Sequence, residues 1–501
     1  MHARYITTTL PYVNASPHIG FALEIVKADV IARLWDSQGD EVFFNTGTDE
    51  HGQKVWQEAV KRGMEPQAYV DEYAAKFKLL KEKLGLYPKL HFIRTTDPHH
   101  KKAAQEFWKR CKKNIGPDGP DIYKKNYKIK YCVGCELEKT DSELVNGRCP
   151  LHPNAELEII DEENYFFRFS RYQQPLLDLY TSRPDFVIPD FRQNEVRLFV
   201  ERGLQDFSIS RLKEKMPWGI DVPGDPDHVV YVWFDALVNY ISTLGWPEDL
   251  KNFEKFWGTH EKPNALQIAG KDNLRQQSAM WQAMLMSAGL PNSKQVVIQG
   301  FITTNGGHKM SKSLGNVINP FDIVDKFGVD ALRYVLLRHT SAFEDSDLTL
   351  ETIHDHYTAH LTNGLGNLVA RVMKLAEKYI EESPAHFVDK ESYIGATGIH
   401  TDEYIRKFEF NHALDEIWNR IKELDEMITK REPFKLVKEN PEEGKAVILD
   451  ITANLCGIGF VLEPFMPDTS KKIIDAIRNN KKPNNLFPRL PRSLQNSRNT
   501  A

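Results

Sequence analysis

Apolar positions near the start of the chain follow two different spacings. Residues 4–10 are rich in Thr, Ile and Tyr, which predicts a β-strand, and residues 11–17 hold the prolines and asparagine typical of a loop. From His18 onward the apolar residues recur at steps of three and four, which predicts a helix. We expect Ser16 to be its N-cap and Pro17 to lie in its first turn.

The same alternation continues along the chain. A strand is predicted over residues 41–45 and a helix over residues 53–62. This order favours a parallel sheet with helices on its faces, so we expect an α/β fold of Rossmann type. Residues 115–222 break into short strands, prolines and glycines, which indicates an insertion. The sheet domain then resumes with a strand over 228–234, a helix over 273–288, a strand over 295–299 and a glycine-rich loop over 306–315.

Beyond residue 349 the pattern becomes helical. Similar spacing runs over residues 412–429 and 445–462, which predicts an α-helical bundle. The first set of apolar positions at helical spacing is Leu361, Leu365, Leu368, Val369, Val372 and Leu375. The predicted segments are the first half of the Rossmann domain (1–114), a connective insertion (115–222), the second half (223–300), a connecting fold with a lysine-bearing loop (301–349), the helical bundle (350–490) and a polar tail (491–501).

Composition narrows the class of protein. A chain of 501 residues is too long for one core, and 41% hydrophobic with 27% charged residues is typical of a soluble multidomain protein. No uninterrupted apolar stretch reaches bilayer-spanning length and the N-terminus lacks the features of a signal peptide, so we expect a cytoplasmic protein without a membrane partner.

The net charge of −5 argues against indiscriminate binding of nucleic acid. RNA contact would then need local basic patches, for which Lys124, Lys125, Lys128 and Lys130 around Tyr123 and Tyr127 are one candidate.

Three of the five cysteines form a cluster with a histidine. Cys132 and Cys135 are separated by two residues, as are Cys149 and His152, and thirteen residues lie between the pairs. Two such pairs can wrap a tetrahedral ion, which predicts one structural Zn²⁺ with no open coordination position. The alternative, buried free thiols beside an incidental histidine, explains neither two-residue gap. Cys111 and Cys456 are expected to be buried small hydrophobic residues, outside the cluster.

Two further segments have the composition of a phosphate site. His18-Ile19-Gly20 opens the first predicted helix, where free N–H groups and the helix dipole favour an anion, although such a start is usually only a turn. The run 309–313, Lys-Met-Ser-Lys-Ser, lies in the glycine-rich loop and presents Lys309 and Lys312 on a flexible segment. A lone lysine pair would normally be a solvated loop.

Taken together, the segments 18–20 and 309–313 resemble the two signatures of class I aminoacyl-tRNA synthetases. The resemblance implies that His18, Gly20, Lys309 and Lys312 act in catalysis and that Ser311 also binds ATP. In that chemistry an amino-acid carboxylate attacks the α-phosphate of ATP, and catalysis needs alignment and positive charge at the departing pyrophosphate.

Over about residues 4–465 the chain is similar to the methionine-specific family of these enzymes. The segments that carry the likeness are 9–14, 47–52, 230–236 and 270–272. The resemblance implies that Asp49 pairs with the methionine ammonium and that Gly270 and Asp272 bind ATP, with Asp272 at the ribose. It places Leu10, Tyr12, Trp233, Ala236 and Tyr240 around the methionine side chain. It also implies Mg²⁺ with ATP, the zinc knuckle, and tRNA(Met), including the initiator, as partner.

The chain departs from the family pattern at four positions. Phe21 stands in place of a second histidine of the first signature, and Asn273 and Gln277 replace an apolar residue and a pocket histidine. We assign Gln277 to the methionine pocket. In the helical region Asn367 and Arg371 match the anticodon-reading segment, while Phe434 replaces a stacking tryptophan and can still stack on a base.

Two other functions stay open at this stage. A different class I synthetase is disfavoured because the insertion is too short for the editing domain of the isoleucine, valine and leucine enzymes, and because cysteine enzymes place zinc in the amino-acid pocket. A catalytically dead RNA-binding paralogue is disfavoured by the intact His18 and 309–313 segments. We expect a monomer, because no dimerising domain follows the bundle.

Overall fold

The computed structural model describes residues 2–14, 16–135, 137–139, 141–304, 306–309, 317–381 and 390–491. The chain folds into two compact units. Unit 1 comprises residues 1–17, 39–79 and 88–299, and unit 2 comprises residues 18–38, 80–87 and 300–501. The expected α/β fold with a C-terminal helical region is confirmed, while the six finer segment boundaries remain predictions.

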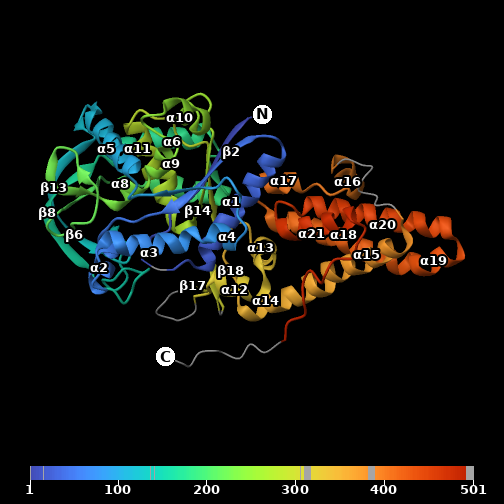
Figure 1. Ribbon diagram of the computed structural model, residues 1–501. Helices are drawn as coiled ribbons and strands as arrows, with labels where there is room; N and C mark the ends of the chain where they lie inside the picture. Colours follow the sequence, from blue (N-terminus) through green and yellow to red (C-terminus); the bar gives the residue numbers. More distant parts are fainter. Residues whose placement is uncertain are drawn as a thin grey trace. The chain divides into compact units, whose positions relative to one another are not determined.

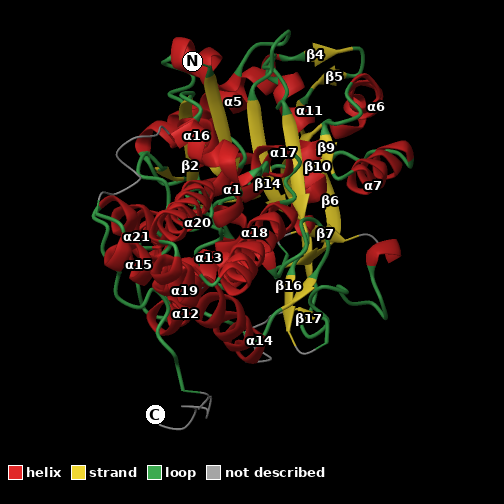
Figure 2. Ribbon diagram, turned by 90° about the vertical axis from the view of Figure 1, so that its right-hand side faces the viewer, coloured by secondary structure: helices red, strands yellow, loops and turns green. Residues whose placement is uncertain are grey.

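A six-stranded sheet forms the centre of unit 1, in the order β3-β2-β1-β14-β15-β9. All five strand pairings are parallel, and the strands lie side by side (Figure 2). The apolar run of β14 is buried along its whole length, as expected of a parallel strand covered on both faces. The strands are β1 (Ala3–Thr8), β2 (Glu41–Thr48), β3 (His91–Arg94), β9 (Val187–Ile188), β14 (Ala265–Gly270) and β15 (Gln295–Gln299).

The strand order reverses between β1 and β14. In an open parallel sheet, ligands bind beyond the carboxyl ends of the strands at such a reversal. The loops that follow these two strands hold Leu10 and Tyr12 on one side and Asp272 on the other. The predicted methionine and ribose residues therefore follow the two strands that flank the reversal.

One aromatic-rich core fills unit 1, with Trp108, Phe234 and Trp281 fully buried in it. Trp108 and Phe107 of α5 contact Phe234 edge to face at 5.4 and 5.7 Å. The helices of unit 1 are α2 (Gln53–Lys61), α3 (Pro66–Lys78), α5 (Pro98–Lys113), α6 (Gln173–Ser182), α7 (Asp190–Glu201), α8 (Val232–Ala236), α9 (Asn239–Ser242), α10 (Leu250–Trp257) and α11 (Trp281–Ser287).

Most strands of the insertion predicted over residues 115–222 form small antiparallel sheets, although this stretch also holds α6, α7 and β9, which joins the central sheet. One antiparallel sheet has the order β10-β8-β6-β7 and carries the cysteine cluster, and a second has the order β11-β13-β12. Their strands are β6 (Ile122–Cys132), β7 (Leu137–Lys139), β8 (Glu158–Phe167), β10 (Phe207–Ser208), β11 (Ser210–Leu212), β12 (Asp221–Val222) and β13 (Asp225–Val230), and a short hairpin pairs β4 (Ile115–Gly116) with β5 (Gly119–Pro120).

Unit 2 is mostly helical. Helices α15, α18 and α21 pack against α20 and lie beside it in Figure 1. A small sheet, β17-β16-β18, pairs β16 (Ile302–Thr304) with β17 (His308–Lys309) and β18 (Ser346–Asp347). The helices are α1 (Ile19–Ser37), α4 (Leu80–Lys83), α12 (Pro320–Phe327), α13 (Val329–Arg338), α14 (Leu350–His356), α15 (Asn367–Tyr379), α16 (Lys390–Thr397), α17 (Thr401–Arg406), α18 (Phe410–Arg431), α19 (Pro433–Glu439), α20 (Pro441–Val461) and α21 (Pro467–Arg478).

Helix α20 has the length and composition of a membrane span, with a mean hydropathy of 1.4 over its best window. Charged residues interrupt the apolar sequence of this helix, so it contains no uninterrupted apolar stretch of bilayer-spanning length. However, 61% of that window is buried inside the protein. The helix therefore has the features of a core helix.

Two local predictions were wrong. Helix α1 begins at Ile19 with His18 as N-cap, not Ser16, because the Ile19 N–H is bound by a carbonyl from elsewhere in unit 2. The strand predicted over residues 228–234 ends at Val230 and turns into α8, since a short buried apolar run does not distinguish strand from helix. The helix predicted over 273–288 is confirmed, and it includes a π-helical stretch, Gln276–Met280, before α11.

Candidate active site and metal cluster

Asp49 and Tyr12 face each other at the carboxyl ends of β2 and β1. They form an isolated parallel bridge, in which the Val13 N–H donates to the Asp49 carbonyl at 3.1 Å and the Asp49 N–H donates to the Pro11 carbonyl at 3.0 Å. Asp49 is only 7% exposed. The two loops are thus joined where the resemblance places the methionine ammonium and side chain.

The residue after Asp49 anchors this loop. The buried Glu50 carboxylate accepts hydrogen bonds from Arg94 Nε at 2.7 Å and from Thr96 Oγ1 at 2.5 Å. Its carbonyl accepts one from the Trp218 indole at 2.6 Å. Such a carboxylate bound by several donors holds the backbone of Asp49 in one position.

A buried network that the sequence analysis did not identify lies beside this loop. Asp235 of α8 accepts from His51 Nδ1 at 2.6 Å and from His100 Nε2 at 2.7 Å, and His100 Nδ1 contacts Ser242 Oγ at 2.8 Å. Burial opposes ionisation of Asp235, but the two histidines outweigh it and lower its pKa to about 2. The network ties α8 to the residue two beyond Asp49. The sequence feature that could have indicated this network is Asp235, an acidic residue within the apolar run 230–236.

Two of the predicted pocket residues are in direct contact. Gln277, in the π-helical stretch, donates through Nε2 to the Tyr240 hydroxyl at 2.7 Å, and its Oε1 accepts from Gln267 of β14 at 3.1 Å. Both Gln277 and Tyr240 are 2% exposed. The amide is therefore fixed in orientation by partners at both ends.

The remaining unit 1 candidates lie on neighbouring elements. Trp233 and Ala236 belong to α8, and the buried indole nitrogen of Trp233 has no hydrogen-bond partner among the residues that the structure describes. Leu10 follows β1 and is partly buried. Gly270 ends β14, and Asp272 lies in the short 3₁₀ turn Lys271–Asn273 that follows it.

In unit 2 the start of α1, which carries the first phosphate-binding candidate, is bonded to a residue that follows the second candidate in the sequence. The Ile19 N–H donates to the carbonyl of Ile318 at 3.1 Å. Ile318 follows the segment 309–313 by five residues in the sequence. His18 is exposed, and its ring lies so close to Gly20 that a Cβ there would be 3.1 Å from it. A side chain at position 20 would crowd the histidine.

The lysine-bearing loop is described only in part. The backbone of Lys309 pairs with Thr303 in the small sheet. Ser311 and Lys312 lie outside the described residues. Their roles remain predictions from the sequence.

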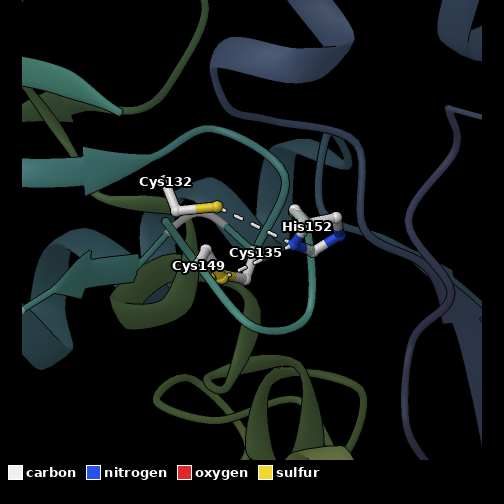
Figure 3. A group of neighbouring side chains, drawn as sticks. All are labelled: Cys132, Cys135, Cys149 and His152. Atoms are coloured by element: carbon white, nitrogen blue, oxygen red, sulfur yellow. Dashed lines mark hydrogen bonds between the residues drawn. The ribbon is translucent and has the colours of Figure 1, made fainter. Parts of the chain in front are cut away.

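The cysteine cluster has the dimensions of a tetrahedral metal site. Figure 3 shows the four side chains pointing toward one another, and their ligand atoms all lie within 4.8 Å. The Cys135 and Cys149 sulfurs are 3.7 Å apart and Cys132 Sγ is 3.7 Å from His152 Nδ1. Tetrahedral zinc with Zn–S bonds of about 2.3 Å places two sulfurs about 3.8 Å apart. The group could therefore hold a metal ion. Gly134 is required here, because a Cβ would lie 2.5 Å from the His152 ring.

The proposed anticodon residues lie on two helices. Asn367 and Arg371 are one turn apart on α15, where Asn367 is exposed and Arg371 forms an ion pair with Asp425 of α18. Phe434 lies near the start of α19 with 43% of its surface exposed. The exposed Phe434 ring is available for stacking, whereas Arg371 already has an acidic partner.

The candidate basic patch on β6 is largely neutralised. Lys124 pairs with Asp225 at 2.8 Å, Lys128 with Asp161 at 3.5 Å and Lys130 with Asp141 at 2.6 Å. Lysines already paired with carboxylates gain little from a phosphate. We therefore do not assign RNA binding to this strand.

A parallel sheet whose strand order reverses between β1 and β14 is the nucleotide-binding architecture expected of a class I aminoacyl-tRNA synthetase. In agreement, the profile of the family described as "tRNA synthetases class I (M)" matches residues 4–156 and 142–373. Methionine–tRNA ligase of Thermosynechococcus vestitus is 41% identical over 481 residues, which cover 93% of this chain and 88% of the relative. Methionine–tRNA ligase of Thermotoga maritima is 40% identical over 490 residues, 96% of this chain and 76% of the relative.

A solved structure agrees with these relatives. Mycobacterium tuberculosis methionyl-tRNA synthetase in complex with methionyl-adenylate is 33% identical and superposes with a TM-score of 0.86, covering 98% of this chain and 99% of that one. The chain belongs to the methionyl-tRNA synthetase family.

Proposed function

We propose that the protein activates L-methionine with ATP and transfers it to the 3′ end of tRNA(Met), including the initiator. In the first step the methionine carboxylate attacks the α-phosphorus, the bond to the β-phosphate breaks, and methionyl-adenylate and pyrophosphate form. In the second step a ribose hydroxyl of the tRNA attacks the methionyl carbonyl and AMP leaves. This role belongs to translation, so we expect the protein in the cytoplasm.

The observation that carries the proposal is the hydrogen bond from Ile19 to Ile318. It joins the helix start that bears His18 and Gly20 to Ile318, five residues beyond the segment 309–313, and the sequence of that segment supplies Lys309, Ser311 and Lys312. We assign the ATP phosphates to these residues, with the ribose at Gly270 and Asp272. Positive charge at a departing pyrophosphate is the main requirement of the activation step. Mg²⁺ bound with ATP would supply further charge neutralisation at the phosphates.

We assign methionine to unit 1. The Asp49 carboxylate, held by the Tyr12 bridge, would pair with the ammonium group. The side chain would lie among Leu10, Tyr12, Trp233, Ala236, Tyr240 and Gln277. Aromatic rings suit a thioether, because sulfur packs favourably against ring edges.

We assign one structural zinc ion to Cys132, Cys135, Cys149 and His152. Four soft or borderline ligands at tetrahedral spacing leave no open position, so the ion would stabilise the insertion and take no part in the chemistry. The helical region would read the anticodon through Asn367, Arg371 and Phe434.

Amino-acid-dependent ATP–pyrophosphate exchange tests the activity. Methionine should support exchange, whereas leucine, isoleucine, valine and cysteine at the same concentration should support far less. Exchange that is strongest with another amino acid would point to a different synthetase, and no exchange with any amino acid would point to an RNA-binding paralogue.

A further inference from the structure

Three histidines of unit 2 converge on one another, away from the cysteine cluster. His339 caps the C-terminal end of α13, His356 ends α14, and His360 lies in the π-helical stretch η6 (Tyr357–Gly366) that continues from α14. All three are partly buried, and one ring nitrogen of each lies within 4.8 Å of the others. His356 and His360 are four residues apart, the spacing at which two helical side chains share a face.

The distance between two of these nitrogens fits a shared ion. His339 Nε2 and His360 Nδ1 are 3.3 Å apart. An ion with tetrahedral geometry and Zn–N bonds of about 2.0–2.1 Å places two ligand nitrogens about 3.3 Å apart. These two nitrogens are therefore already at the separation that a shared ion requires, and the backbone of His339 and His360 need not move.

The third ring needs a small adjustment. His339 and His356 are stacked, with centroids 3.5 Å apart and an angle of 6° between the rings. Lone pairs of parallel rings do not meet at one point, so His356 must turn about its Cβ–Cγ bond. The turn ends the stacking of the two rings, and the metal–nitrogen bond would replace that contact.

Neutral imidazole is the form that binds a metal ion, and it is the ordinary form of histidine above about pH 6.5. The Tyr334 hydroxyl lies 2.8 Å from His360 Nδ1 and 3.1 Å from His339 Nε2, beside the same position.

We propose that His339, His356 and His360 form a second metal site, which binds one divalent transition ion of the zinc, cobalt or nickel class. Imidazole ligands suit these ions. With three protein ligands, the fourth position would be open to water next to Tyr334. The ion would join the end of α13 to α14 and η6. Because η6 runs directly into α15, it would stiffen the base of the helix that carries Asn367 and Arg371.

Cobalt titration of the full-length protein, purified with zinc in its cysteine cluster, tests the proposal. We expect one further Co²⁺ per chain, with visible d–d absorption but without the near-ultraviolet sulfur-to-cobalt band that exchange into the cysteine cluster would produce. His360→Gln should weaken this binding by more than about tenfold, since even the loss of an outer-shell partner costs 10–100-fold. His412→Ala, an exposed histidine of α18, should bind cobalt as the unmodified protein does.

A folding defect is separated from ligand loss by measuring the zinc content and far-ultraviolet circular dichroism of each variant. His356→Gln provides a second variant that removes a different ligand. The proposal is overturned if no cobalt binds without the sulfur band, or if folded His360→Gln and His356→Gln both retain it at full affinity. Either result would leave the three rings as a packed cluster around Tyr334.

Discussion

At the scale of single residues, Gln277 is the position in the proposed methionine pocket where the sequence is expected to depart from the family pattern. Its amide is held between Gln267 and the Tyr240 hydroxyl. Removal of the amide in Gln277→Ala leaves a buried hydroxyl and a buried amide without one partner each, which costs about 1–3 kcal/mol. We expect a higher KM for methionine and weaker discrimination against leucine in the exchange assay.

Two variants make this prediction specific. Tyr240→Phe removes only the hydroxyl and should shift the methionine KM in the same direction by less. Gln174→Ala, on the surface of α6, should leave KM unchanged. Unchanged KM and discrimination in Gln277→Ala would remove Gln277 from the pocket.

The ionisation of Asp235 makes the free energy of unfolding of unit 1 depend on pH in the acidic range. Its folded pKa of about 2 lies below the value of about 3.9 in an unfolded chain. The stabilisation is therefore complete above about pH 4 and is lost as the pH falls through 2, with a size on the order of 2 kcal/mol. Asp235→Asn should be less stable at pH 7 and should lose stability less steeply between about pH 4 and 2.

The measurement is urea denaturation across this pH range. Asp227→Asn, an exposed position on β13, serves as the matched control and should follow the unmodified protein. An Asp235→Asn variant with an unchanged acid profile would show that the two histidines do not hold this carboxyl as described.

These residues also show what the sequence could predict of the site. Tyr12 and Asp49 were identified because they stand in recognisable segments after two strands, and the structure joins them. His51, His100 and Asp235 were missed, because their contact depends on α5 and α8 meeting in space. No local spacing encodes a network whose members are 49 and 135 residues apart.

At the scale of elements, the cysteine cluster should bind one zinc ion per chain. Elemental analysis should find it, and Cys135→Ala should lose it, because a tetrahedral site with three ligands binds more weakly. Gly134→Ala should also lower the zinc content, because the added Cβ would meet the His152 ring. Gly395→Ala, which has open space around it, is the matched control. Full zinc retention in Cys135→Ala would contradict the four-ligand site.

A buried ion pair joins α1 to α13 inside unit 2. Arg333 and Asp29 are fully buried and 2.7 Å apart, and Arg333 also donates to the carbonyls of Phe465 and Pro464. Arg333→Ala removes one of the two arginines that pair with Asp29, since Arg33 Nε also lies 2.7 Å from its carboxylate, and should destabilise unit 2 by about 3 kcal/mol. Arg431→Ala, exposed at the end of α18, should change stability by less than about 0.5 kcal/mol.

Urea denaturation followed by tryptophan fluorescence gives these values. Equal unfolding midpoints for Arg333→Ala and Arg431→Ala would show that the buried pair contributes nothing to the fold.

The sequence predicted helices and strands correctly where a helical periodicity extended over many residues or where turn residues marked both ends of a strand. The strand over residues 295–299 agrees with β15, the apolar spacing over 412–429 lies within α18, and the spacing over 445–462 agrees with α20 to within one residue. Prediction failed where tertiary contacts decide the boundary. The Ile318 carbonyl sets the start of α1, and burial on all sides hides the change from β13 to α8.

At the scale of the whole molecule, activation and RNA reading are assigned to different parts of the chain and should fail independently. Lys312→Ala removes positive charge at the pyrophosphate, a transition-state contact worth on the order of 3 kcal/mol or about a hundredfold in rate. Both exchange and tRNA charging should fall. Asn367→Ala with Arg371→Ala should instead preserve methionine-dependent exchange while tRNA charging falls steeply.

Lys471→Ala, an exposed lysine on α21, controls for the loss of charge alone and should leave both activities intact. Normal charging by the Asn367 and Arg371 double variant, or a loss of exchange as severe as in Lys312→Ala, would refute this division of labour.

The central claim is that the chain attaches methionine to tRNA(Met). Its most direct test is aminoacylation of a tRNA(Met) transcript by the purified protein with ATP, Mg²⁺ and each of the twenty radiolabelled amino acids in turn. We predict that methionine is esterified to the transcript much faster than any other amino acid. Faster attachment of another amino acid, or no attachment of methionine by a preparation that retains its zinc, would contradict the account.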